Sequence, residues 1–474
     1  MVLQDALADR WLSAAEVVAS IGDAAAAHDA VRVVAEAAAR AAPLERARLA
    51  RCAELLVAEH AAARAAWDAH FAAGPGVVAA DAVAEIVHQQ VALPTNPSRA
   101  TTTLGQTVVA TAPVRIDLAG GWSDTPPICH ELGGAVVNAA VSLDGQHPLR
   151  VMATLRKEPT VRITSIDLDQ SVEYTRTEDL LSFREVRDWS SLPKAALVLS
   201  GFVPSDPSVD LGEWLGGVGG GVGGGVQLTL SAAVPKGSGL GTSSILGATA
   251  LAALSTLAGS VESRDGLIAC TSALEQLMRT GGGWQDQLGG IVPGCKIVRT
   301  VPGVEQRPVV EPIEIPRAAR EELGTRMILY YTGLQRLAAD IVQKVVGRYL
   351  AREPECLAII RDLKSDAERM RDELACGDID AFARTLGAYW LLKQRLDPGS
   401  TTPAIESLFA EVRDELSGYE LPGAGGGGFL LLIATDAAAA ERVRAKLGAL
   451  RPNPTARLYD AAIDDRGLVV TVEP

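Results

Sequence analysis

The chain lacks the features of a secreted, membrane-spanning or nucleic-acid-binding protein. Its six cysteines are scattered, with no C-x-x-C pair and no cysteine–histidine cluster, which predicts reduced thiols and no cysteine-based metal site. No uncharged run is long enough to span a membrane, and no basic segment followed by an apolar one marks a signal peptide at the N-terminus. A formal net charge of −14 repels nucleic acids and anionic membranes. We therefore expect a cytoplasmic protein with no nucleic-acid or membrane partner.

The common nucleotide-binding motifs are also missing. The chain has no G-x-x-x-x-G-K-[ST] and no H-R-D…D-F-G set, which excludes a P-loop ATPase and a protein kinase. Gly423, Gly425 and Gly428 match G-x-G-x-x-G, but a helix is predicted before them and a strand after them. The dinucleotide fingerprint needs a strand before and a helix after. We therefore expect a glycine turn whose backbone packs against another loop.

Length and composition predict more than one domain. The 474 residues are 48% hydrophobic and 22% charged, which is typical of a globular chain of two or three domains. Residues 1–92 are alanine-rich at helical spacing and form a predicted helical leader, which Ser13, Asp23 and Pro43 divide into four helices. Residues 93–106 form a linker rich in Pro, Ser and Thr. The sequence does not indicate what the leader does.

From residue 107 onward the pattern predicts an α+β protein whose two strand-bearing halves meet near residue 320, giving domains at 107–320 and 321–474. The glycine-rich residues 216–225 are predicted to be a flexible loop tip, with a second phosphate loop as the alternative. The predicted strands are 107–112, 114–118, 135–142, 149–155, 161–166, 226–234, 289–300, 309–315, 326–332, 429–434 and 468–472. The predicted helices are 243–259, 262–280, 336–350, 353–375, 378–393, 403–417 and 436–449, with 178–201 partly helical.

The most informative segment reads Pro-Lys-Gly-Ser-Gly-Leu-Gly-Thr-Ser-Ser over residues 235–244, between a predicted strand and a predicted helix. Glycines at 237, 239 and 241 let the backbone turn tightly and approach a ligand closely. The free N–H groups and the dipole of the helix that follows favour a phosphate. We expect a phosphate-binding loop here, with an ordinary left-handed turn as the alternative.

Two further segments carry acidic side chains on glycine-rich turns. Asp124 follows Gly120-Gly121-Trp122-Ser123, where it either accepts hydrogen bonds from vicinal hydroxyls or caps a turn. Glu275 lies in the last turns of a predicted helix, and Asp286 on the glycine-rich loop beyond it. Glu275 with a hydroxyl and nucleotide phosphates would suit Mg²⁺, and Asp286 could orient or deprotonate an attacking hydroxyl. The alternative is a pair of solvated acids at a helix end.

Together these loops resemble the GHMP sugar-kinase superfamily. The order matches: a Pro-x-Arg strand and loop at 113–127, the Gly-Ser-rich loop at 235–244, and Gly-Ala-Gly-Gly-Gly at 423–427. The first two segments and Gly-Gly-Trp-Gln-Asp-Gln at 282–287 look most like those of L-fucokinases. The resemblance covers about residues 107–474. It implies a ribosomal-protein-S5-like α+β domain followed by a ferredoxin-like α+β domain, after the helical leader. It also implies an enzyme that uses ATP and Mg²⁺ to phosphorylate the anomeric hydroxyl of L-fucose.

The resemblance also implies roles for individual residues. Asp286 matches the catalytic aspartate, and Arg115 the basic residue that keeps this acid ionised and neutralises the transferring phosphoryl group. Glu275 and Ser243 match the Mg²⁺ ligands, with Thr242 as the alternative hydroxyl. The implied nucleotide-binding residues are Lys236, Gly237, Ser238, Gly239, Leu240, Gly241, Thr242, Ser243 and Ser244. The implied sugar-binding residues are Gly121, Trp122, Asp124, Trp284, Gly425 and Gly426.

A few residues bear on which sugar is the acceptor. Galactokinases carry Gly-Glu-His where this chain has Gly120-Gly121-Trp122, which argues against galactose. L-Fucose has a methyl group in place of a CH₂OH, and Trp122 or Trp284 could face it. A heptose-phosphate kinase is the alternative, with Arg150, Arg156 and Lys157 as its extra phosphate-binding cluster. A catalytically inactive sugar sensor is the alternative outside enzymes, although Glu275, Ser243 and Asp286 are all present. The expected partners are a small sugar and ATP, and the sequence leaves homo-oligomer formation open.

Overall fold

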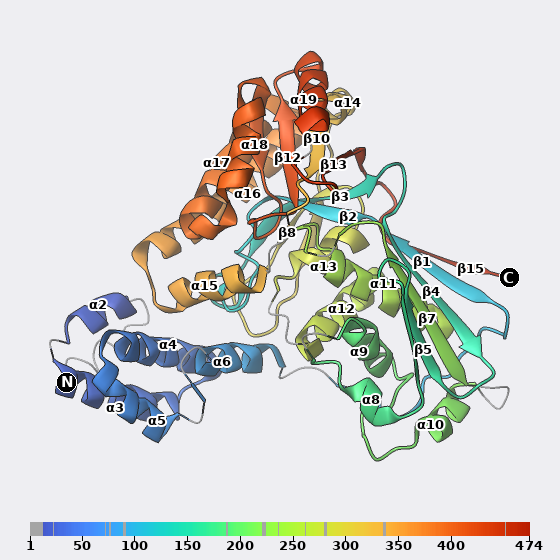
Figure 1. The fold of residues 1–474 in the computed structure, drawn as a ribbon, viewed down its shortest axis with the longest axis horizontal. Helices are drawn as coiled ribbons and strands as arrows, with labels where there is room; N and C mark the ends of the chain where they lie inside the picture. The colour runs from blue at the N-terminus through green and yellow to red at the C-terminus, as the bar shows by residue number, and fades with distance from the viewer. Residues whose placement is uncertain are drawn as a thin grey trace.

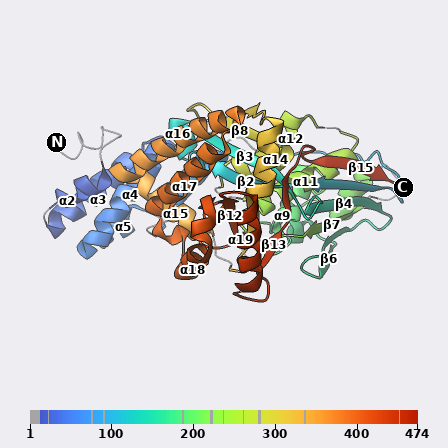
Figure 2. The ribbon, with the colours of Figure 1, turned by 90° about the horizontal axis from the view of Figure 1, so that it is seen from above.

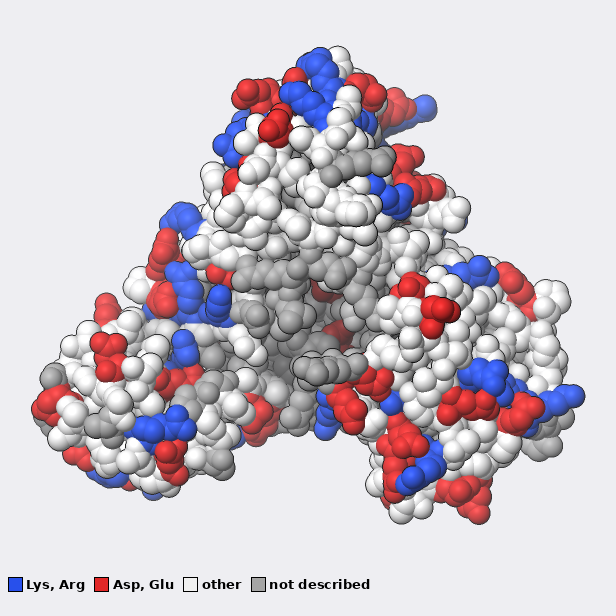
Figure 3. Space-filling view, viewed as in Figure 1, with Lys and Arg blue, Asp and Glu red and all other residues white. Residues whose placement is uncertain are grey.

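The molecule has three lobes: the leader, a first α+β domain and a second α+β domain (Figure 1). Figure 3 shows a hollow where the three lobes meet, with Asp or Glu side chains at its floor. The computed structural model describes residues 13–21, 23–71, 73–74, 77–88, 92–185, 188–219, 224–235, 237–260, 262–278, 282–334, 338–450 and 452–474.

The leader is a small helical unit with its own core. The side chain of Asp23 accepts a hydrogen bond from the N–H of Ala26, and Pro43 occupies the first turn of its helix, so the predicted helix starts are confirmed. The structure describes five α-helices where four were expected. Trp67 is fully buried and stacks on Phe71. The helices are α2 (Ala14–Ala19), α3 (Ala24–Ala38), α4 (Pro43–Glu59), α5 (Arg64–His70) and α6 (Val77–His88), with a 3₁₀ turn at Ala61–Ala63.

The first domain contains two sheets. The six-stranded sheet has the order β15-β1-β4-β7-β5-β6, and α11 packs against β1 and β4. These strands are β15 (Val469–Glu473), β1 (Thr107–Ala112), β4 (Leu149–Arg156), β7 (Gly225–Ala232), β5 (Val161–Ser165) and β6 (Gln170–Tyr174). In the second sheet, β2 pairs with β3 in the series β14-β3-β8-β9. Its strands are β2 (Val114–Ala119), β3 (Ala135–Leu143), β8 (Cys295–Arg299), β9 (Val309–Pro312) and β14 (Ala461–Ile463).

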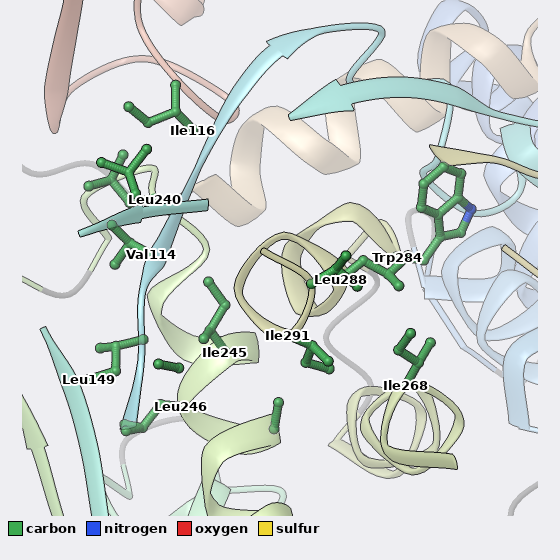
Figure 4. Packing of buried hydrophobic residues seen from close by; sticks show 14 of the residues in the cluster. Val114, Ile116, Leu149, Leu240, Ile245, Leu246, Ile268, Trp284, Leu288 and Ile291 are labelled. Atoms are coloured by element: carbon green, nitrogen blue, oxygen red, sulfur yellow. The ribbon is translucent and has the colours of Figure 1, made fainter. Parts of the chain in front are cut away.

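Helices cover both sheets and bring α13 against β2 and β3 (Figure 4). Gly289 and Gly290 of α13 are necessary for this contact: a Cβ at Gly289 would lie 2.3 Å from Arg115 Cβ, and one at Gly290 would lie 2.4 Å from Ile245 Cγ2. The helices of this domain are α7 (Ile128–Leu132), α8 (Thr177–Leu181), α9 (Ser191–Leu199), α10 (Leu211–Val218), α11 (Thr242–Leu257), α12 (Arg264–Met278) and α13 (Gln285–Ile291).

The second domain is an antiparallel sheet covered by long helices (Figure 2). The order β11-β12-β10-β13 is the ferredoxin-like arrangement, which confirms the expected fold. Its strands are β10 (Met327–Tyr331), β11 (Leu416–Glu420), β12 (Phe429–Ala434) and β13 (Arg457–Tyr459). Its helices are α14 (Arg317–Arg326), α15 (Ala338–Leu350), α16 (Pro354–Cys376), α17 (Ile379–Leu396), α18 (Pro403–Val412) and α19 (Ala437–Leu450), with 3₁₀ turns at Pro398–Ser400 and Arg413–Glu415. Helices α16 and α17 also contact β2 of the first domain.

The chain crosses between the two α+β domains twice. After β13, the strands β14 and β15 return to the sheets of the first domain, where β14 pairs with β3 and β15 with β1. The first domain therefore includes residues from the C-terminal end of the chain, and the boundary near residue 320 describes only one of the two crossings. The domain limits as drawn from the sequence stay a prediction.

Several predicted elements differ from the structure. The strand expected at 289–300 is wrong in its first half, because residues 285–291 form α13 and the strand begins at Cys295. The helix expected to 417 ends at Val412, and β11 follows. Of the expected loop 216–225, residues 216–218 belong to α10, Gly225 starts β7, and 220–223 lie outside the described residues. Among the described helices, none has the length and apolar composition to cross a bilayer.

Candidate active site

The loop between β7 and α11 has the conformation that its glycines permit. Gly237, Gly239 and Gly241 have φ values of +70°, +84° and +68°, which residues with a side chain rarely adopt. Gly241 is the N-cap of α11, and no side chain caps the first turn of this helix. An uncapped helix start presents N–H groups and the positive end of the helix dipole, so it suits a phosphate. Lys236, the expected cation of this loop, lies outside the described residues.

The glycine turn of the second domain packs directly on this loop. Gly239 and Gly423 are so close that a Cβ on Gly423 would lie 3.0 Å from Gly239 O, and a Cβ on Gly239 would lie 2.4 Å from Pro422 O. The N–H of Phe429 donates to Ser238 O at 3.2 Å. The expected packing of one loop on another is confirmed. The element before the turn is β11, not the helix expected from the sequence, yet the strand β12 after it still excludes the dinucleotide fingerprint.

Arg115 and Asp286 meet beside this loop. The Arg115 guanidinium donates from Nε to Asp286 Oδ1 at 3.0 Å, from Nη2 to the same oxygen, and from Nη1 to Gly239 O at 2.7 Å. Arg115 is 4% exposed and Asp286 is 28% exposed, so the carboxylate is the accessible member of the pair. Burial lowers the pKa of Arg115, but Asp286 and Asp117 outweigh it, so the net pKa is raised and the cation is retained.

Asp286 lies in the first turn of α13, not on a loop as the sequence suggested. A carboxylate in the first turn interacts favourably with the helix dipole. The position is fixed from both sides, because α13 packs on β2 through Gly289 and on α11 through Gly290. In Figure 4, Ile245 of α11 lies beside Ile291 and Leu288 of α13, and Trp284 extends away from them at the start of that helix.

Asp124 is adjacent to the same helix start. Its Oδ2 accepts from the backbone N–H of Gln285 at 3.1 Å, and its Oδ1 accepts from the Gln285 side chain at 3.2 Å. It is fully buried, and burial, with a further contribution from Asp286, raises its pKa to about 7 even though the Gln285 N–H opposes the shift. These contacts are those of a turn cap: Asp124 holds the start of the helix that carries Asp286, the residue after Gln285. The binding of a sugar hydroxyl by Asp124 stays a prediction.

The two tryptophans expected at the sugar site are both nearly buried. Trp122 has a φ of +76°, unusual for a residue with a side chain, and is 6% exposed. Trp284 is also 6% exposed, and its ring fills the space beside Gly134, where a Cβ would lie 2.7 Å from Cζ2. Its indole nitrogen is buried without a hydrogen-bond partner among the described residues.

The hydroxyls and the acid expected to bind Mg²⁺ lie on two packed helices. Ser243 is exposed in the first turn of α11, whereas Thr242 is buried with its Oγ1 3.3 Å from Ser238 Oγ. Glu275 is half-buried on α12, which packs against α11. Hydroxyl and carboxylate oxygens are ligands that Mg²⁺ prefers, and Ser243 is the more accessible of the two hydroxyls.

The remaining glycines expected at the sugar site are Gly425 and Gly426 of the glycine turn and Gly121, which follows β2. Gly425 has a φ of +81°, and a Cβ there would lie 2.5 Å from Ser400 O. The N–H of Gly426 also donates to Ser400 O. Gly121 has room for no side chain, since a Cβ would lie 2.5 Å from Tyr389 Oη and 2.6 Å from Asp117 Oδ2. Close packing therefore explains Gly121 and Gly425, and Gly426 has a φ of +80°, which residues with a side chain rarely adopt.

A buried polar cluster that was not expected from the sequence lies behind Arg115. It is made of Asp117, Tyr389, Lys393 and Glu420. Tyr389 Oη donates to Asp117 Oδ2 at 2.7 Å, and Lys393 Nζ lies 3.2 Å from Glu420 Oε2. All four side chains are at most 2% exposed. Burial, Asp117 and Glu420 raise the pKa of the Tyr389 phenol well above its usual value, so this hydroxyl is a donor. Three of the four residues are on elements about 270 to 300 positions from Asp117, so no local pattern could have pointed to them.

Glu420 makes the stability of the protein depend on pH. Burial raises its pKa to about 8 despite Lys393, while Asp117 contributes in the same direction as burial. Between about pH 4.5 and 8 the folded protein retains a proton that the unfolded chain has lost, so this group makes stability fall as pH rises through that window. We expect the Tm of Glu420→Gln to rise relative to wild type between pH 5 and pH 8.

Thermal unfolding at both pH values tests this, with Glu441→Gln on the exposed face of α19 as the control. Parallel Tm curves for Glu420→Gln and wild type would show that Glu420 ionises normally.

Two family models match the chain. Residues 212–293 match the GHMP kinases N terminal domain, and residues 366–453 match the GHMP kinases C terminal domain. The chain belongs to the GHMP kinase family. The first match contains the Gly-Ser-rich loop at 235–244, Glu275 and Asp286, and the second contains Tyr389, Lys393 and the glycine turn. The fold expected for a GHMP kinase is confirmed by the same two matches.

Comparison with individual proteins adds further similarity. The chain is 38% identical over 369 residues to an L-fucokinase/L-fucose-1-P guanylyltransferase of Bacteroides fragilis, a match of 77% of this chain and 38% of that protein. The chain thus spans about two fifths of this relative's length. It is 25% identical over 346 residues to a D-glycero-alpha-D-manno-heptose 7-phosphate kinase of Campylobacter jejuni, covering 69% of this chain and 89% of that one. The structure of Lactococcus lactis galactokinase complexed with galactose superposes with a TM-score of 0.56 at 16% identity, covering 77% of this chain and 95% of that chain.

Proposed function

We propose that this GHMP kinase transfers the γ-phosphoryl group of ATP to the anomeric hydroxyl of L-fucose. The observation that carries the proposal is the contact of Arg115 with both Asp286 and Gly239 O, which joins an accessible carboxylate to the phosphate loop. The 38% identity to a protein named L-fucokinase/L-fucose-1-P guanylyltransferase supports L-fucose as the acceptor. A cytoplasmic location belongs to the same proposal and is supported by six free cysteines.

Phosphoryl transfer depends on positioning and charge rather than on covalent help from the protein. The phosphates of ATP would lie on the loop 237–244, against the open N-terminus of α11. Asp286 orients the acceptor hydroxyl and takes its proton late in the reaction. Arg115 holds that carboxylate in place through its hydrogen bonds and neutralises charge on the transferring group. Asp124 fixes the start of α13 through Gln285, and so the position of Asp286, besides accepting from sugar hydroxyls.

Ser243 and Glu275 are the residues that would hold Mg²⁺, because their oxygens suit a hard cation at the phosphate end of the site. Bound there, Mg²⁺ would supply charge neutralisation at the phosphates. The accessible Ser243 fits this role better than the buried Thr242.

An ADP-release assay tests the function. L-Fucose, D-galactose and a heptose 7-phosphate would be compared as acceptors at equal concentration. We expect L-fucose to be preferred, by the ratio of kcat/KM values, with phosphate found on its anomeric oxygen by ³¹P and ¹³C NMR. A preference for the heptose phosphate would assign the chain to the alternative activity, and no ADP release with any sugar would favour a sensor. The heptose alternative gains nothing from Arg156, which is paired with Glu173 and Glu158.

The contribution of Trp122 to sugar recognition is a separate prediction. If its ring faces the methyl group of L-fucose, Trp122→Ala should raise the KM for L-fucose about tenfold, the effect of losing an apolar contact of roughly 1.4 kcal/mol. The same change should leave the KM for ATP unaffected. Trp214→Ala, at a half-buried tryptophan on α10, is the control. Trp122→Phe preserves an aromatic ring in case the alanine variant unfolds, and an unchanged KM for L-fucose in both variants would remove Trp122 from this role.

A further inference from the structure

Asp117 connects β2, the strand that carries Arg115, to the second domain. Arg115 and Asp117 are two positions apart on β2, so their side chains leave the same face of the strand. Asp117 is 1% exposed, and its Oδ2 accepts from Tyr389 Oη of α17 at 2.7 Å. The negative charge of Asp117 is one of three, with those of Asp286 and Asp124, that raise the pKa of Arg115 and retain its cation.

Lys393 lies one turn after Tyr389 on α17 and contacts the same cluster. Its Nζ is fully buried, 3.9 Å from Asp117 Oδ2 and 4.9 Å from the centre of the Tyr389 ring. The same Nζ donates to Leu421 O at 2.6 Å. Leu421 is the first residue of the glycine turn, and the next residue, Pro422, touches Gly239. The Lys393 ammonium group therefore contacts both Asp117, which lies behind Arg115, and the glycine turn that packs on the loop at Gly239.

Two series of contacts from α17 end at the guanidinium group of Arg115. Through Asp117, α17 acts on the buried side of Arg115. Through Leu421 and Pro422, it supports Gly239, whose carbonyl oxygen accepts from Arg115 Nη1 at 2.7 Å. The groups around Arg115 belong to the first domain and are supported from the second, so the cation has one preferred position, which phosphoryl transfer requires.

We propose that Tyr389 and Lys393 are positioning residues for phosphoryl transfer. From the second domain they hold Arg115 in the orientation that the reaction needs, through Asp117 and through the glycine turn. The proposal rests on the proposed function, because Arg115 is taken to act on the transferring phosphoryl group. It adds that the orientation of Arg115 depends on α17, so the reactive arrangement exists only while the two domains are packed together.

Tyr389→Phe and Lys393→Met test this with little change of volume. We expect kcat to fall about tenfold or more in each variant while KM for ATP and for the sugar changes less than about twofold, since the lost interaction matters in the transition state. The controls are Tyr419→Phe, whose ring packs on Phe409 away from this cluster, and Lys446→Met on α19. The double variant Tyr389→Phe/Asp117→Asn should be no slower than Asp117→Asn alone, because Tyr389 acts through Asp117.

An NMR experiment tests the proposal without any turnover. The Nε–Hε signal of Arg115 would be assigned in [¹⁵N]arginine-labelled protein by its absence from Arg115→Lys. We expect this signal to shift or broaden in Tyr389→Phe and to stay unchanged in Tyr419→Phe. An unmoved signal, or a kcat per folded molecule equal to that of wild type, would overturn the proposal even if Tm falls. A wild type that fails to phosphorylate L-fucose, with the Arg115 signal still responding to Tyr389→Phe, would overturn the substrate and leave the positioning role supported.

Discussion

Replacing Asp286 with asparagine is expected to lower kcat by about 10²- to 10⁴-fold, the range typical of losing a general base. The amide oxygen can still accept from Arg115 Nε, which donates to Asp286 Oδ1 at 3.0 Å in wild type. The helix α13 is held mainly by Gly289, Gly290 and the Asp124–Gln285 contacts, none of which involves the carboxylate. The variant should therefore fold, and the KM for ATP should change little.

Steady-state ADP release over a range of sugar concentrations would measure this, with circular dichroism and nucleotide binding to show an intact fold. Asp465→Asn is a suitable control, because Asp465, in the turn after β14, forms an exposed ion pair with Arg320 of α14. A variant at position 286 that turns over within a few-fold of wild type would mean that another group takes the proton.

Arg115→Lys is expected to lower kcat by about 10²- to 10³-fold, the effect seen when a preorganised charge stabiliser is removed. The guanidinium reaches the Asp286 carboxylate and Gly239 O at the same time, with donors in a fixed fork. A lysine ammonium is a single point of charge and cannot contact both in that geometry. Since positive charge is retained near Asp286 and Asp117, we expect the Tm to fall less than it does in Arg115→Met.

The same kinetic assay, run with Arg457→Lys as a control on the exposed edge of the second domain, would test this expectation. If Arg115→Lys preserved kcat, charge alone would account for the role of this residue, and its forked geometry would be unimportant. If instead the KM for ATP rose while kcat stayed unchanged, Arg115 would act in binding the nucleotide.

Much of the fold was predictable because local patterns determined it. Strands β1 and β12 have the predicted bounds, and α11 begins one residue from its predicted start, since alternation and apolar runs with clear turn signals mark these elements. The misread segment 289–300 contains Gly-Gly-Ile-Val-Pro, which resembles the start of a strand. Its glycines instead allow a helix to approach Arg115 and Ile245, and this reason becomes visible only with β2 and α11 in place.

The residues of the candidate site also fall into those that a local pattern predicts and those that only the structure reveals. Arg115, Gly239 and Asp286 are carried by motifs, and the structure brings them into contact as the resemblance implied. Tyr389 and Lys393 lie in the second half of an amphipathic helix, Lys393 in its last turn, where a buried tyrosine and lysine look like ordinary packing. Their partner Asp117 is some 270 residues away, so only the packing of α17 on β2 reveals what they contact.

The return of β14 and β15 to the first domain has a mechanical consequence. The second domain is attached by two covalent connections, one entering through α14 and one leaving after β13. A domain attached at two points rotates most easily about the line that joins them, and it resists twisting or sliding in other directions. Any opening that admits a sugar and releases a product should follow this single axis. Each closure should then return α17 to the same position against β2.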